Sequence, residues 1–452
     1  MVDNLYVFDK VTNPCYSLKH FLIKTNFELS ELKNDNPSSI ENYAVFLHEY
    51  THYLQAFTTV NGLSVLLSYL DKIVRMTLDI GENILTNTTT AREINIRYKD
   101  DFSFVSKKLI WKREPRKIPY TNTKPNYFVI NIDNPIFKQK TDEVFIYNIY
   151  DGLFYHVSTT MLRENMAMMA YFSIRNIGQD AIMDYVKINP SPQNPYNCKY
   201  WLLFNYFLYK YPQIKNVVKF TYFFCELSLM QINTGSFIKK LLADIDALLG
   251  RKNYTYVNEN IFFEELFRKN IETINNDVII IEKLINIIDE YINDLIKNYE
   301  FFSTIQKILK IAKTGIEYKK SNCTIYREIM DMRWICMMSE LFFSPVIIQP
   351  NKIVSTINIS QDYVNHLGLL FGISIIMDMI TSKEILVECP FFNDIPICYL
   401  ISERTINICS NNPFKITLFT DGGCLFYNSC LTLGLLPSKE LEQYIKGFKV
   451  NL

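Results

Sequence analysis

The sequence predicts an α+β protein with three regions. Residues 1–35 alternate between apolar and polar side chains as strands do, whereas residues 204–319 repeat apolar side chains every three or four positions, which is typical of helices. Further helices are expected around 327–342 and 364–380, and strand-like runs return at 397–401 and 414–419. The chain has 452 residues and 48% hydrophobic content, enough for more than one domain. We therefore expect an N-terminal α+β domain over residues 1–200, a mainly helical subdomain over 201–320, and a mixed α/β C-terminal region over 321–452.

The N-terminal region is expected to begin with a small sheet and continue into a helix. Residues 5–8 and 16–27 are the candidate strands. Pro37 then interrupts the chain, and Ser38 and Glu41 have the spacing of a capping box, so a helix should begin here. Asn61-Gly62 is a plausible end, and a second helix is expected at 63–78. The apolar stripe of the first helix comprises Ile40, Ala44, Leu47, Tyr50 or Thr51, and Leu54.

The first predicted helix carries the motif His48-Glu49-Tyr50-Thr51-His52, which contains two of the five histidines in the chain. Positions i and i+4 share one helix face, so both imidazoles can reach one zinc ion. Glu49 lies about 100° further round the helix, where it can face a metal-bound water without being a ligand. The alternative interpretation is that both histidines are ordinary, partly buried residues of an amphipathic helix.

A catalytic zinc usually has three protein ligands and an open position, so one further ligand is needed. Glu164 is the best candidate, because it lies in an apolar, Met- and Ala-rich helical stretch from about 158 to 176, where a lone carboxylate requires a partner. Small Ala167, one turn on, would let two helices approach closely. Glu164 could instead pair with Arg163 or Arg175 on a solvated face. Other possible ligands on later helical segments are Glu226, Glu264 and Glu265.

Tyr155 and His156 are candidates for stabilising the transition state, because a hydrogen-bond donor aimed at the developing oxyanion is a common catalytic device. If the helix of Glu164 extended back to them, the eight positions between His156 and Glu164 would place the two within about 80° of one another round the helix.

The motif, with the distant Glu164-Asn165-Met166-Ala167, resembles the zincin metallopeptidases of the gluzincin type. The resemblance implies a zincin-like catalytic domain with a small mixed sheet and active-site helices. It also implies a Zn²⁺ cofactor and hydrolysis of peptide bonds in a protein or peptide substrate. His48, His52 and Glu164 would be the ligands and Glu49 the general base. The metzincin extension is absent after His52.

The spacing departs from that family, since Glu164 lies 112 positions after His52, far more than in compact gluzincins. A polar, strand-rich insertion is therefore expected at about 85–145, with alternating runs at 91–98 and 127–132.

Charge and hydropathy narrow the classes of partner. The formal net charge is zero and the pI is about 6.9, which gives no reason to expect nucleic acid as a partner. The N-terminus lacks the basic and apolar parts of a signal peptide, and the apolar run at 367–377 is too short to cross a bilayer. These features predict a soluble cytoplasmic protein.

Five of the ten cysteines lie in the last 64 positions: Cys389, Cys398, Cys409, Cys424 and Cys430. They are expected to be free thiols, with a structural zinc site as the weaker alternative.

Two other functions remain open from the sequence. About half the chain exceeds what a core zincin needs, which favours a proteolytic effector, such as a toxin or defence component, switched on by a regulatory protein partner. A catalytically silent metal-binding interaction module is the other alternative, although the intact Glu49 argues against it.

Overall fold

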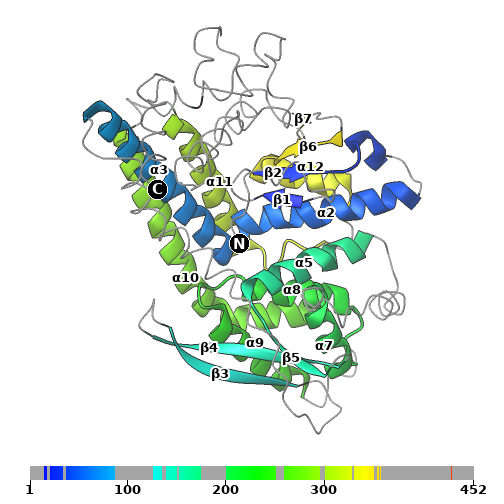
Figure 1. Ribbon diagram of the computed structural model, residues 1–452. Helices are drawn as coiled ribbons and strands as arrows, with labels where there is room; N and C mark the ends of the chain where they lie inside the picture. Colours follow the sequence, from blue (N-terminus) through cyan, green and yellow to red (C-terminus); the bar gives the residue numbers. More distant parts are fainter. Residues whose placement is uncertain are drawn as a thin grey trace, which may run out of the picture.

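The computed structural model describes residues 15–17, 21–33, 37–86, 126–134, 139–149, 152–174, 200–250, 259–295, 301–327, 330–350, 354–355, 357 and 429. Over these residues the fold is mixed α and β, as the sequence predicts, and most of the described residues are helical. Figure 1 shows a layered arrangement in which one small sheet lies above α2, helices α5 and α8 lie below it, and a second sheet closes the opposite side.

The upper sheet has four short strands in the order β1-β2-β6-β7. The first two pair antiparallel and replace the single long candidate strand at 16–27, because the chain turns between them at Phe21, which has φ 50°. β2 then pairs in parallel with β6, a segment from the C-terminal third of the chain. The sheet therefore joins distant parts of the sequence. Its strands are β1 (Cys15–Ser17), β2 (Leu22–Lys24), β6 (Val346–Ile348) and β7 (Val354–Ser355), and the short 3-10 helix η2 (Leu29–Lys33) follows β2.

Helix α2 (Pro37–Thr58) contains the His-Glu motif and is followed directly by α3 (Val60–Thr86). The break comes at Thr59, three residues before the expected Gly62, because the Thr59 hydroxyl accepts the backbone N–H of Gly62 at 3.0 Å and caps α3. Gly62 has a different role. A Cβ at this position would lie 1.9 Å from the backbone oxygen of Gln55, so only glycine permits this close approach.

Tyrosine hydroxyls fix α2 against α12 (Met332–Phe342) and the residues just before it. Tyr43 donates to the Met330 carbonyl and Tyr53 to the Phe342 carbonyl, both at 2.7 Å, and Tyr50 shares a hydrogen bond of 3.1 Å with Ser339. These three side chains are buried, so each bond gives a partner to a hydroxyl that would otherwise be buried without one. The expected apolar stripe is confirmed at its buried members, whereas Ile40, near the start of α2, is 42% exposed.

The second sheet contains three antiparallel strands, β3 (Tyr127–Asn134), β4 (Gln139–Asn148) and β5 (Leu153–His156), in that order. β3 confirms the strand expected at 127–132. The expected run at 91–98 lies outside the described residues. Helix α5 (Thr159–Ile174) follows β5 after a short connection and carries Glu164.

The described residues between 201 and 320 are mainly helical, and their helices pack on α2, α3, α5 and β4. They are α7 (Leu202–Lys210), α8 (Val217–Ser228), α9 (Thr234–Leu249), α10 (Glu259–Leu295) and α11 (Phe301–Ser321). The helix expected at 327–342 begins later, at α12, where the Asp331 carboxylate accepts the N–H of Trp334 at 3.0 Å and caps it. The expected strands at 5–8, 397–401 and 414–419, the helix at 364–380 and the five C-terminal cysteines lie outside the described residues.

Candidate metal centre

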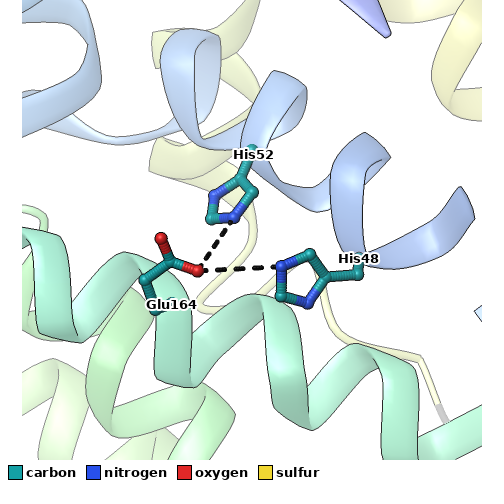
Figure 2. A group of neighbouring side chains, drawn as sticks. All are labelled: His48, His52 and Glu164. Carbon is teal, nitrogen blue, oxygen red and sulfur yellow. Dashed lines mark ion pairs between the residues drawn. The ribbon is translucent and has the colours of Figure 1, made fainter. Parts of the chain in front are cut away.

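Three side chains from two packed helices converge on one point. Figure 2 shows His48 and His52 projecting from α2 toward Glu164 on α5. The Glu164 Oε2 atom lies 3.7 Å from His48 Nε2 and 3.5 Å from His52 Nε2. One ligand atom from each residue falls within 4.8 Å of the others, so the structure brings together the three residues that the sequence proposes as ligands.

The local sequence explains why the helices approach here. His48 and His52 are four positions apart, and their rings meet edge to face with centroids 5.0 Å apart. On the opposing helix, Ala167 follows Glu164 by one turn and is completely buried, with no side chain beyond Cβ to hold α2 away. The three converging side chains keep 14 to 17% of their surface exposed, so the point where they meet is partly accessible.

The spacing of the three groups is compatible with a metal site. An N–H···O bond has a donor–acceptor distance of about 2.7 to 3.2 Å. Ligand atoms around a tetrahedral zinc with bonds of about 2.0 to 2.1 Å lie about 3.3 Å apart. The distances of 3.5 and 3.7 Å from Glu164 to the two imidazoles are close to the second value. Two imidazole nitrogens and a carboxylate oxygen are also a ligand set that zinc accepts.

Glu49 lies on α2, directly after His48, and is only 9% exposed. Burial raises the pKa of Glu49, as does the Glu164 carboxylate, while His48, His52 and the backbone N–H of Tyr16 act in the opposite direction. The Tyr16 N–H bonds the Glu49 carboxylate, so strand β1 runs past the site.

A second set of hydrogen bonds fixes His52 from behind. Its Nδ1 lies 3.0 Å from Gln55 Oε1, and Gln55 Nε2 donates to the Arg163 carbonyl at 3.0 Å. This leaves His52 Nε2 directed at Glu164. Burial alone would lower the pKa of His52, but Glu164, Glu49 and Gln55 together outweigh it and raise the pKa. Gln55 is 1% exposed, so the bridge is part of the packed core.

The alternative partner for Glu164, the neighbouring Arg163, is directed to another helix. Its Nη2 donates to Asn61 Oδ1 at 2.9 Å, which joins α5 to the first turn of α3. Burial lowers the pKa of Arg163 to about 10, so the guanidinium is still charged at neutral pH. Arg175, the other alternative, lies outside the described residues.

The helical placement of Tyr155 and His156 is wrong, because both residues belong to strand β5. The chain alternates sides along a strand. Tyr155 is buried in the main core, and His156 lies on the other face, with its ring 5.3 Å from that of Phe145. No continuous helix therefore joins His156 to Glu164, so the two residues do not share a helix face. An aromatic side chain that does lie beside the site is Tyr200, just before α7, whose ring centroid is 6.3 Å from that of His48.

Two of the alternative third ligands are engaged elsewhere. Glu226 is fully buried on α8 and receives the Lys319 ammonium at 2.7 Å and the Ile325 N–H at 2.9 Å. Glu264 is exposed and pairs with Arg268 one turn later on α10. Glu265 is on the same helix, next to Glu264, and is not part of the converging group.

Sequence reasoning missed Tyr16, Gln55 and Tyr200. Gln55 could have been found, because it lies three positions after His52 on the same helix and thus beside it. Tyr16 and Tyr200 come from distant parts of the chain and carry no local signal.

No protein family, curated protein or solved structure matches the sequence. Among the described helices, none is both long and apolar enough to cross a membrane.

Proposed function

We propose that the protein is a zinc-dependent hydrolase with a zincin-like site that cleaves peptide bonds in a protein or peptide substrate. The observation that carries the proposal is the convergence of His48 and His52, from an H-E-x-x-H helix, with Glu164 from a second helix. Three protein ligands leave a position open, which is what separates a catalytic zinc site from a structural one. A zinc ion held there would polarise a water molecule and a carbonyl group and would lower the pKa of that water.

Glu49 supplies the proton transfer in this proposal. It is buried beside the ligands, and the Tyr16 backbone N–H holds its carboxylate in place. A carboxylate in that position can accept a proton from the attacking water and return it to the leaving amine. Both steps use the same side chain, so losing the Glu49 carboxylate should affect the chemistry far more than metal binding.

The neighbouring strand supports a peptide as the substrate class. β1 is the terminal strand of its sheet among the described residues, and its backbone passes Glu49. An extended peptide can add to such an edge through backbone hydrogen bonds. The substrate would then lie along β1 with its carbonyl groups near the ligands.

Metal analysis and one substitution test the proposal together. Purified protein dialysed against zinc should hold one equivalent, and it should cleave members of a proteome-derived peptide library, read by mass spectrometry. Glu49→Gln should keep the zinc and lose at least about 100-fold in cleavage rate. Glu264→Gln, at an exposed position far along the chain, serves as the control. Zinc-free wild-type protein, or a fully active Glu49→Gln variant, would refute the proposal.

A further inference from the structure

Helix α10 has an apolar stripe on its outer face that the fold does not use. Four large apolar side chains, Ile280, Leu284, Ile287 and Tyr291, are between 40 and 61% exposed. Their spacings are four, three and four, which is the a/d repeat of a coiled coil over two heptads. At 1.5 Å per residue, the stripe is roughly 17 Å long.

This outer stripe is separate from the one that holds α10 in the protein. The buried residues of the same segment, Ile281, Ile285, Ile288 and Ile292, face the core, and α10 packs there against α3 and α11. With 100° per residue, the centres of the two stripes lie about 100° apart round the helix, because each buried residue directly follows an exposed one. Two ion pairs, Glu282 with Lys320 and Asp289 with Lys313, also join α10 to α11. The outer stripe is therefore not an extension of the core.

Opposite charges flank the stripe on one side only. Leu284 and Tyr291 are the a positions of the repeat. Lys283 and Glu290, which come directly before them, are both exposed and lie seven positions apart. The equivalent positions on the other flank are Ile281 and Ile288, which are buried inside the protein. A helix that docked on the stripe would thus meet one basic and one acidic group along a single edge.

We propose that the stripe binds the stripe of a second copy of this chain, with the two α10 helices antiparallel about a two-fold axis. In this register Leu284 packs on Ile287 of the partner subunit, and Ile280 packs on Tyr291 of the partner subunit. Lys283 then faces Glu290 of the partner subunit, and the symmetry repeats the pair at the other end. In the antiparallel orientation, each apolar residue meets an apolar residue and each charge meets an opposite charge on the second copy. In a parallel pair the charged flank would face the Ile281 and Ile288 side, and both charges would be left unpaired.

Sedimentation velocity of the full chain tests the proposal through its charge pattern. The wild-type protein should dimerise at micromolar concentrations. Lys283→Glu places two acidic groups at each end of the pair, and Glu290→Lys places two basic groups there. Each single variant should dimerise at least about tenfold more weakly than the wild type. High salt screens the repulsion, so it should reduce this difference. An equimolar mixture of the two variants should restore the dimer as a heterodimer, because every pair is then again of opposite charge.

Two further variants separate this surface from others. Leu284→Glu should abolish the dimer, whereas Ile261→Glu should not affect it, because Ile261 is 61% exposed on another face of the same helix. Circular dichroism would verify that each variant is folded. A wild-type monomer throughout, a dimer that survives Leu284→Glu, or a mixture that fails to restore the dimer would each overturn the proposal.

Discussion

Replacement of Glu226 by Gln should strongly destabilise the protein without affecting its metal binding. The Glu226 carboxylate has no exposed surface and its partner Lys319 is 2% exposed, with 2.7 Å between the charged atoms. The same carboxylate accepts the Ile325 N–H at 2.9 Å and the hydroxyl of Thr324. Removing one member of a buried ion pair leaves the other charge uncompensated and costs about 3 to 5 kcal/mol. We expect a loss of about 4 kcal/mol for Glu226→Gln, because the remaining ammonium is held inside the core between α8 and α11.

Urea unfolding, followed by circular dichroism, measures this loss as a shift of the midpoint at constant slope. The double variant Glu226→Gln with Lys319→Met should recover part of the stability, because no buried charge then remains. Glu264→Gln is the control. That residue is 58% exposed and its pair with Arg268 should contribute less than about 1 kcal/mol. A loss of less than about 1 kcal/mol in Glu226→Gln, or a loss of zinc by the folded variant, would refute the structural role assigned to this carboxylate.

Three further outcomes follow from the geometry. Gly315→Ala should lower the free energy of unfolding by about 1 to 3 kcal/mol, because its Cβ would lie 1.9 Å from the Phe57 oxygen, whereas Thr314→Ala in the same urea assay should change it by less than about 1 kcal/mol. Gln55→Met should weaken zinc binding about 10- to 100-fold in competition with a chromophoric chelator, with the fold unchanged, since the methionine fills the space but cannot orient the His52 ring. Zinc at 100 times its dissociation constant should stabilise the wild type by about 2.7 kcal/mol and His52→Ala much less; equal stabilisation of both would place the metal elsewhere.

The motif helix and the helix that carries Glu164 are both predictable from local patterns, because their signals are periodic. α2 shows helical spacing of apolar residues, and the 158–171 stretch is rich in strong helix formers. The predicted end of α2 at Asn61-Gly62 is wrong, because Gly62 is not a terminator of this helix and instead lets the chain approach Gln55. Both explanations require glycine, and only the three-dimensional contact separates them.

The placement of Tyr155 and His156 failed for a related reason. The prediction continues the helix of Glu164 back to Tyr155, whereas this stretch divides into strand β5 and helix α5 at a short connection. Pairing decides this, because Tyr155 and His156 are opposite Ile146 and Phe145 of β4. Short apolar segments are ambiguous between strand and helix until their neighbours are known. The pairing of β2 with β6 was inaccessible for the same reason, since it joins residues more than 300 positions apart.

The contrast between Glu164 and Glu226 shows why Glu164 is the better candidate for a metal ligand among these two carboxylates. Both lie on helices in contact with each other, α5 and α8, and both are shielded from solvent to a large extent. Glu226 faces an ammonium and two further donors at hydrogen-bonding distance, so its charge is balanced by the protein itself. Glu164 faces two imidazole nitrogens at 3.5 and 3.7 Å, longer than hydrogen bonds and close to the separation of atoms that share an ion. A divalent cation held between the three groups would balance the charge of the Glu164 carboxylate. Sequence alone left both glutamates as candidates, and the identity and distance of their partners favour Glu164 as the ligand.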